Sequence, residues 1–297
     1  MNKDDINKRI NEIELEMTAT DFWSDKDRAQ SLIKEMNELK DQSEGKDKYD
    51  KGNAVLTVFA GAGGDDAEDF ARMLVEMYLK FIEKQNWQVA LLHKNENDHG
   101  GYRNITFEIC GKDVYGSLRY ESGVHRLVRL SPFNAKKQRH TAFAMVEVTP
   151  AIDDLKDFVV PEEEIRVEFS KSGGPGGQNV NKRETAVRVV HIPSEIAVHV
   201  DSERSQAQNR EKALKLLYGK LYKAMEEQKK KEEEGLHVSK STQIEWGSQI
   251  RSYVLHPYKM VKDHRTEVEI AHPDKVLDGD IEPFLEAEKA MAQEGKL

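Results

Sequence analysis

Residues 54–82 read AVLTVFAGAGGDDAEDFARMLVEMYLKFI, and this stretch decides the expected fold class. Five of its first six residues are apolar, and the run is rich in strand formers, which predicts a strand. A glycine-rich turn follows, then four carboxylates within five positions, then apolar residues at helical spacing as far as Ile82. Acidic side chains in a first turn stabilise the positive end of the helix dipole. The stretch therefore predicts a strand, a glycine turn and an amphipathic helix whose N-terminus projects from that turn.

Similar patterns extend in both directions from this stretch. Upstream, apolar residues at helical spacing predict a hairpin of two helices, and the charged segment 42–52 predicts a linker. Downstream, strands are predicted at 88–92, 104–109, 142–148, 165–169, 186–192, 196–200 and 249–255. A long helix is predicted from about residue 203 to 234, and a final helix near the C-terminus. The buried stripe of the long helix is expected to consist of Leu214, Leu217, Leu221 and Met225.

The order of these elements predicts an α+β multidomain chain. With 297 residues and 38% hydrophobic content, two or three modest cores are expected rather than one. We expect a helical hairpin at 1–45 and an α+β unit at 52–160 that the C-terminal segment 243–297 completes. A second α+β unit at 161–236 is then an insertion into the first.

Composition excludes several function classes. No run approaches eighteen apolar residues and the start is acidic and polar, so we expect neither a membrane span nor an export signal. The single cysteine, Cys110, cannot form an internal disulfide, which suits a cytoplasmic protein. The net charge of -9 comes from the ends, since residues 1–50 and 278–297 contribute -5 and -4. Between them lies a local basic patch: Arg119, Arg126, Arg129, Lys136, Lys137 and Arg139.

The turn at 61–64 resembles a phosphate loop only superficially, because the lysine and hydroxyl residue of a P-loop are missing. A tight turn into a helix is the default interpretation. The functional alternative is that the uncapped helix start at Gly63, Gly64 and Asp65 offers backbone groups to one base of a nucleic acid.

The segment 172–182, SGGPGGQNVNK, is the most unusual in the chain, with four glycines and a proline in five consecutive positions. Such a backbone is exposed and allows close approach to a substrate. The amide of Gln178 has no useful pKa and cannot act as a general acid or base. Its backbone N–H and positioned amide suit stabilisation of an oxyanion or leaving oxygen.

Here the sequence resembles the class I peptide chain release factors. The resemblance rests on Gly176-Gly177-Gln178 with the following Asn-Val-Asn, and on Arg204, Gln206 and Asn209 at the start of the long helix. It covers roughly residues 52–292. It implies an α+β fold with an N-terminal helical hairpin, a codon-reading α/β-sandwich-like domain and an inserted Gly-Gly-Gln domain. It also implies that Gly176, Gly177 and Gln178 are catalytic and that Lys182, Arg183, Arg204 and Gln206 contact RNA.

The segment 121–129 resembles the family signature that precedes the codon-reading loop, and Ser131-Pro132-Phe133 resembles the tripeptide of the class that reads UAA and UGA. A serine hydroxyl both donates and accepts, so it tolerates A or G at the second base. The resemblance implies that His140 stacks on unstacked bases and that Thr141 bonds the second or third base. Gly63, Gly64 and Asp65 complete the expected recognition set.

Residues 243–255 resemble the family's switch segment, in which Trp246 would pack against ribosomal RNA; a core tryptophan is the equal alternative. His191 and His199 lie in predicted strands without metal-ligand spacing, so they are interpreted as structural or surface residues, and no metal or other cofactor is expected.

The resemblance implies a translation termination factor that binds both ribosomal subunits, an mRNA stop codon and P-site peptidyl-tRNA. It also implies a methyltransferase that modifies Gln178 and leaves open a class II release factor GTPase. The family's first domain is a larger helical bundle than the hairpin here, which puts the GTPase contact in doubt.

Two alternatives remain at this point. One is a codon-independent rescue hydrolase, which Ser131-Pro132-Phe133 and the acidic C-terminal segment 278–297 oppose. The other is a ribosome-binding homologue without catalytic function.

Overall fold

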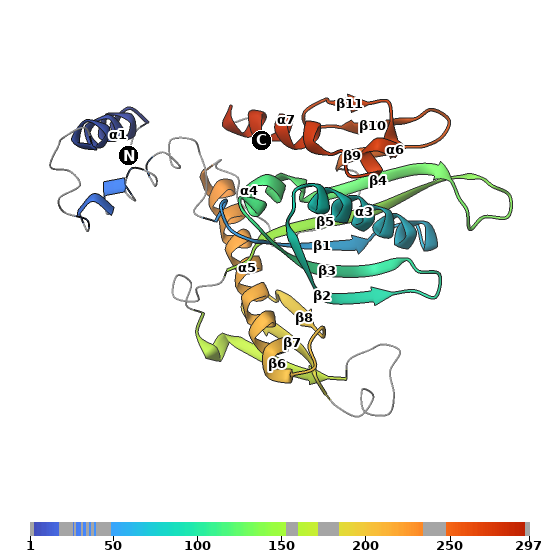
Figure 1. Cartoon of the computed structure of the whole chain (residues 1–297). Coiled ribbons are helices and arrows are strands. Elements are labelled where there is room, and N and C mark those ends of the chain that lie inside the picture. The colour runs from blue at the N-terminus through green and yellow to red at the C-terminus, as the bar shows by residue number, and fades with distance from the viewer. Residues whose placement is uncertain are drawn as a thin grey trace.

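The computed structural model describes residues 3–17, 26, 28–30, 32–33, 36, 39, 49–152, 160–171, 184–233 and 248–294 (Figure 1). Near the N-terminus, α1 (Lys3–Met17) is followed by helical positions between 26 and 39. Ile10, Ile13 and Leu39 are buried against one another, with Met17, Leu32 and Met36 packed around them. The apolar spacing in the sequence thus becomes a small helical core of its own.

Most of the chain is organised around one eight-stranded sheet with the order β11-β10-β9-β4-β5-β1-β3-β2. All neighbouring strands are antiparallel except β4 and β9, which are parallel. The strands are β1 (Ala54–Ala60), β2 (Gln88–Glu96), β3 (Tyr102–Cys110), β4 (Gly123–Leu130), β5 (Arg139–Pro150), β9 (Gln249–Val254), β10 (Met260–Asp263) and β11 (Glu269–Ile270). We call residues 49–152 and 248–294 the large unit, because β9 brings the C-terminal segment back beside β4 (Figure 1).

Helices of the large unit cover one face of this sheet. The main one is α3 (Asp65–Lys84), and the others are α4 (Val114–Leu118), the 3-10 turn η2 (Arg119–Glu121), α6 (Pro273–Leu277) and α7 (Glu282–Gln293). Side chains alternate along a strand, so Leu56 and Val58 of β1 lie in the core with α3, whereas Val55 belongs to a second core on the opposite face. Burial on both faces explains why the predicted strand is an almost continuous apolar run.

The small unit, residues 160–171 and 184–233, covers that second face. Its three antiparallel strands have the order β6-β7-β8, namely β6 (Ile165–Ser170), β7 (Ala186–His191) and β8 (Ala197–Val200), with a 3-10 turn η4 (Glu162–Glu164) before them. The long helix α5 (Gln206–Glu233) packs on β7 and β8 through Ala213, Leu217 and Leu221. The predicted stripe was wrong at Met225, which is 56% exposed, because α5 continues past the end of the small sheet (Figure 1).

The α+β, multidomain fold class is therefore correct. Sequence patterns missed β4, β10 and β11, and they placed the start of the long helix three residues before Gln206. The boundaries 1–45, 52–160 with 243–297, and 161–236 stay predictions, and segment 234–247 lies outside the described residues. Within the described parts of the chain, no helix is long and apolar enough to cross a membrane.

Candidate functional site

The β4–β5 hairpin carries Ser131, Pro132 and Phe133 at its turn. Ser131 is buried, with its N–H donating to the Gln138 carbonyl at 3.0 Å and its Oγ accepting from the Phe133 N–H at 3.2 Å. Pro132 and Phe133 are exposed. The serine hydroxyl therefore shapes the turn from inside, and the two residues after it form the outer surface.

His140 and Thr141 are neighbours at the start of β5, so their side chains point to opposite sides of the strand. His140 pairs with Arg129 across the hairpin and is held on both ring nitrogens, since Nδ1 is 2.8 Å from Asp66 Oδ2 and Nε2 is 3.0 Å from Asn134 Nδ2. An amide nitrogen can only donate, so Nε2 accepts and Nδ1 carries the proton given to Asp66. The ring is fixed in orientation, while Thr141 is exposed.

The glycine turn before α3 packs beside these residues. Gly61 N–H donates to the Phe143 carbonyl at 2.8 Å, and Phe143 N–H donates to the Ala62 carbonyl at 2.9 Å, which ties the turn to β5. Gly63 has φ +139, and a Cβ there would lie 3.1 Å from Ala142 Cα, so glycine is required. Gly64 (φ +59) is the N-cap and provides no side chain to cap α3, so the N–H groups of Asp65 and Asp66 have no side-chain cap, whereas the Ala67 N–H donates to the Gly64 carbonyl at 2.9 Å.

Asp66 joins all three segments beneath the surface. It is 5% exposed and receives hydrogen bonds from Ser131, His140 and Arg129. Burial opposes its ionised form, but these hydrogen bonds prevail and hold the pKa of Asp66 below its ordinary value. Arg129 also donates to Asp69 at 2.6 Å. An ionised Asp66 thus fixes the hairpin, β5 and α3 relative to one another.

We call the exposed face above Asp66 the hairpin surface. It brings together predicted residues that lie up to 77 positions apart in the chain, namely Gly63, Gly64, Asp65, Pro132, Phe133 and the half-exposed His140. Thr141, the next residue of β5, is exposed on the other side of the strand. At its rim, Lys136, Lys137 and Arg139 are exposed. The predicted basic patch is thereby halved: Arg119 pairs with Asp50, Arg129 pairs with Asp66 and Asp69, and Arg126 is partly buried in the middle of β4. Three cations at the hairpin tip remain available to an anionic ligand.

The predicted catalytic residues lie outside the described part of the chain; these are Gly176, Gly177 and Gln178. The same holds for three other predicted residues, Lys182, Arg183 and Trp246. The structure does describe the chain just after the Gly-Gly-Gln segment. Gln206 Nε2 donates to the Glu184 carbonyl at 2.8 Å, and Asn209 Nδ2 donates to the Thr185 carbonyl at 2.8 Å. Two amides at the start of α5 thus anchor this end of the segment. Arg204, next to them, is exposed.

The small unit is fastened to the large one along α5. A Cβ at Gly219 would collide with the Pro150 carbonyl, so helix and strand approach each other as closely as backbone permits. Within the next helical turn after this contact, Lys220 pairs with Glu147 at 2.6 Å and Lys223 donates to the Val148 carbonyl at 2.8 Å.

Sequence analysis missed several residues of this arrangement. Asp69 and Arg129 support Asp66, Asn134 fixes His140, and His99 from the β2–β3 turn lies 6.2 Å from Phe133, ring centre to ring centre. Arg129 and Asn134 flank the Ser-Pro-Phe tripeptide, so that motif was the available signal for them. Nothing in the local pattern around His99 connects it to residue 133.

Comparisons with known proteins agree with this geometry. The PCRF domain family matches residues 44–146, and the RF-1 domain family matches residues 153–265. Peptide chain release factor 2 of Thermotoga sp. (strain RQ2) is 39% identical over 336 residues, covering 97% of this chain and 91% of that protein. That of Thermotoga petrophila is 48% identical over 241 residues, covering 81% of this chain and 65% of that protein.

A solved structure is similar over nearly the whole chain. RF2 of Thermus thermophilus matches with a TM-score of 0.74 and 40% identity, covering 96% of this chain and 81% of that one. The 336 residues of the first alignment exceed the 297 of this chain, so that relative contains positions with no counterpart here. From its motifs, its fold and these relatives together, the chain belongs to the peptide chain release factor 2 family of translation termination factors.

Proposed function

We propose that this chain reads UAA and UGA in the ribosomal A site through the hairpin surface and promotes hydrolysis of P-site peptidyl-tRNA through Gly176, Gly177 and Gln178. One observation carries the first half: Asp66 holds the Ser-Pro-Phe hairpin, His140 and the start of α3 together around one exposed face. A hairpin turn forms without contacts to such distant segments, so forming the turn does not explain why these segments meet.

The hairpin surface supplies the chemistry that single-stranded RNA requires. Unpaired bases are recognised by stacking and by hydrogen bonds to their edges. The His140 ring and the exposed Phe133 are flat aromatic faces, the neighbouring Thr141 hydroxyl donates and accepts, and the start of α3, which lacks a side-chain cap, offers backbone N–H donors. Lys136, Lys137 and Arg139 suit phosphates of the mRNA or of ribosomal RNA.

Ser131 takes a different part from the one that the sequence suggested. Its hydroxyl is buried and hydrogen-bonded to Asp66 and to the Phe133 N–H. In this conformation Ser131 sets the shape of the turn, and a direct bond from its Oγ to the second base requires that Oγ leave Asp66. The tolerance for A or G would then depend on a turn rearrangement on the ribosome.

Hydrolysis follows from the glycine-rich segment. The Gln178 backbone N–H would stabilise the tetrahedral intermediate or the departing ribose oxygen, and its side chain would restrict the nucleophile to water. Lys182, Arg183, Arg204 and Gln206 would contact RNA, and Trp246 would act in the switch between the units. Ribosomal RNA would supply much of the electrostatic environment, so the isolated chain should hydrolyse little. Methylation of Gln178 and a cytoplasmic location belong to the same proposal.

The test is peptide release from ribosomes that hold labelled peptidyl-tRNA in the P site, with UAA, UGA, UAG, a sense codon or no codon in the A site. We expect release on UAA and UGA alone. Release independent of the codon would instead identify a rescue hydrolase, and binding without any release would identify a ribosome-binding homologue.

Two variants separate the two halves of the proposal. Gly177→Ala adds a Cβ where backbone must approach the ester, so it should abolish release and leave ribosome binding nearly intact. Gly173→Ala, four residues upstream, is its matched control and should retain most release. Thr141→Val removes only a hydroxyl and should lower release on both stop codons, whereas Ser202→Ala, an exposed hydroxyl on the small unit, should not.

A further inference from the structure

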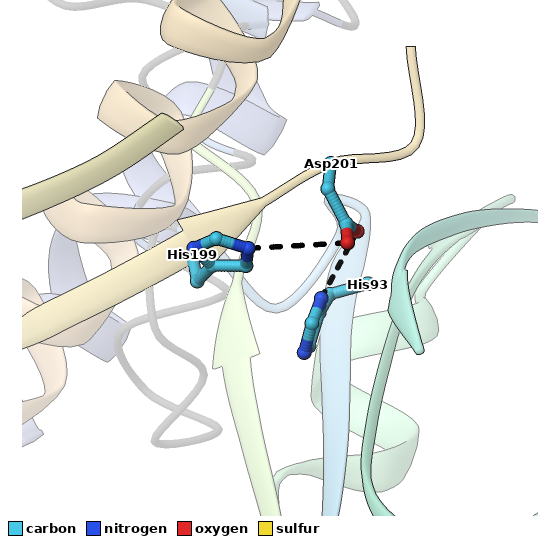
Figure 2. Close-up of side chains that lie close together, drawn as sticks. All are labelled: His93, His199 and Asp201. Carbon is cyan, nitrogen blue, oxygen red and sulfur yellow. Dashed lines mark hydrogen bonds and ion pairs between the residues drawn. The ribbon is translucent and has the colours of Figure 1, made fainter. Parts of the chain in front are cut away.

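Two histidines and an aspartate meet where the small unit contacts the large one (Figure 2). His93 lies on β2, and His199 and Asp201 lie at the end of β8. His93 Nδ1 is 3.0 Å from Asp201 Oδ1, and His199 Nε2 is 3.9 Å from Asp201 Oδ2. One ligand atom from each of the three residues lies within 4.8 Å of the other two. All three side chains are partly buried, with exposures of 16%, 33% and 13%.

Local backbone structure explains why they converge. The pairing of β2 with β3 shifts register between Leu91 and His93, which leaves Leu92 as an extra residue. Such bulges redirect side chains, and Leu92 enters the core of the small unit. Its carbonyl accepts from the Asp201 N–H at 3.4 Å. His199 and Asp201 are two positions apart, so both face away from the buried Val198 and Val200 and toward β2.

The donor set is one that zinc prefers. Zinc binds imidazole nitrogen at about 2.0–2.1 Å and carboxylate oxygen at about 2.0–2.2 Å. In a tetrahedron, such bonds place ligand atoms about 3.4 Å apart. His93 Nδ1 lies 3.0 Å from Oδ1 of Asp201, His199 Nε2 lies 3.9 Å from the other oxygen, and one ligand atom from each residue lies within 4.8 Å of the other two, so metal binding requires the set to contract. From this geometry we propose that His93, His199 and Asp201 bind a divalent transition metal of the zinc type, with water in the fourth position.

The charges around the three side chains favour a bound cation. Neutral imidazole is the form that binds metal, and the Asp201 carboxylate beside both rings supplies a negative charge. A positive charge also lies near the site, on Arg188, which pairs with His199 across β7 and β8. Arg188 donates to Glu168 at 2.7 Å, so its charge is already balanced within the small unit.

Such a site would act as a clamp between the units. One ligand comes from the large unit and two come from the small unit, so the complete set exists only while β2 and β8 are together. A ligand that binds only one arrangement stabilises that arrangement by mass action. Bound metal would therefore favour the arrangement seen here over any in which the small unit has moved away. This inference goes beyond stop-codon reading and holds whether or not that reading is correct.

The test uses the full chain without a histidine tag, stripped with chelator and then titrated with Zn²⁺ by calorimetry at pH 7. We expect one equivalent bound at the site. His93→Ala and Asp201→Asn should each weaken binding by more than about 100-fold, the upper range for changes that only reorient a ligand. His191→Ala is the matched control, because His191 also ends a strand of the small sheet but bonds Ser194 and Glu164 instead.

Two readouts make the outcome decisive. Co²⁺ in the same titration should give the visible absorption of a tetrahedral site in the control and lose it in the His93 variant. Zinc should also raise the melting temperature of the control and not that of Asp201→Asn. Absence of stoichiometric binding, or equal binding by the His93 variant, would overturn the proposal and leave a hydrogen-bonded contact between the units. Denaturation curves without metal show that each variant is folded.

Discussion

Two arginines of the large unit form the same kind of ion pair with carboxylates, but the two ion-pair networks have different roles. Arg251 on β9 is fully buried and donates to Glu121 at 2.6 and 2.9 Å, to Glu288 at 2.6 Å and to Asp263 at 3.3 Å. Arg129 on β4 is 14% exposed and donates to Asp69 and Asp66. Both stand among carboxylates from distant segments, and they differ mainly in depth.

Depth decides what each network does. The carboxylates around Arg251 come from η2, β10 and α7, so this arginine joins the returning C-terminal segment to the rest of the sheet unit. The carboxylates around Arg129 come from α3 alone, and one of them also holds His140. A buried ion cluster is costly to break because it leaves bare charges without water. A half-buried one costs less, and its value lies in where it places its neighbours.

The largest effect is expected for Arg251→Met. Methionine fills much of the volume but removes the guanidinium that bridges Glu121, Asp263 and Glu288. Glu121 then keeps the Tyr78 hydroxyl, and Arg265 still pairs with Asp263 and Glu288, so unfolding free energy should fall by about 3–5 kcal/mol. Urea denaturation followed by circular dichroism measures it. A loss under about 1 kcal/mol would mean that Arg251 contributes packing and not charge compensation.

The same substitution at the other arginine sharpens the comparison. Arg129→Met should cost only about 1–2 kcal/mol, because Asp69 keeps Arg72 and Asp66 keeps Ser131 and His140. Release on UAA and UGA should nevertheless fall at least about tenfold, a change of about 1.4 kcal/mol in the barrier, since the hairpin loses its link to α3. Equal effects of both variants on release per folded molecule would end the distinction between them.

The sequence predicted some parts of the fold and of the site and missed others. The strand, glycine turn and α3 were predicted because each depends on neighbours a few positions away. The Ser-Pro-Phe and Gly-Gly-Gln segments were found because their composition is unusual in itself. β4 was missed, because it lies between β5 and β9 and its sequence GVHRLVRL does not alternate strictly between apolar and polar residues.

Contacts between distant segments were beyond reach for a physical reason. A charge run shows which side chains are cations but not which of them meet carboxylates 60 residues upstream, as Arg129 meets Asp69. His93 and Asp201 are 108 positions apart, and a bulge in β2 brings them together. Helix periodicity likewise placed Met225 on the buried face but could not tell where the small sheet ends.

Charge counting within the buried cluster gives a pH-dependent prediction. Arg251 and Arg265 face three carboxylates, and Glu121 also receives the Tyr78 hydroxyl, whereas Glu288 Oε2 has no hydrogen-bond partner among the described residues. Burial, then repulsion from Glu121, raises the pKa of Glu288 to about 9. Its proton thus stabilises the folded state fully below the ordinary pKa of 4.5, and that contribution is lost as the pH rises toward 9.

Glu288→Gln removes this titration and little else, since the amide resembles the protonated acid in shape. Between pH 6 and 7 the unfolding free energy of the unchanged chain should fall by about 1.4 kcal/mol more than that of the variant. Urea denaturation at a series of pH values gives both curves. Parallel curves would show that Glu288 is ionised throughout and that the cluster carries its extra negative charge.

The smallest effect is expected at Arg72, which completes the comparison from the exposed side. Arg72 is 41% exposed and contacts the same carboxylate as Arg129, with Nη2 2.7 Å from Asp69 Oδ1. Water screens such a pair, so Arg72→Ala should cost about 0.2–0.5 kcal/mol and leave release on UAA and UGA unchanged. Its urea curve and release rate are measured beside those of Arg129→Met. If Arg72→Ala lowers release as much, then charge near Asp69 matters more than position. If it does not, the distinction belongs to the one arginine that reaches both Asp66 and Asp69.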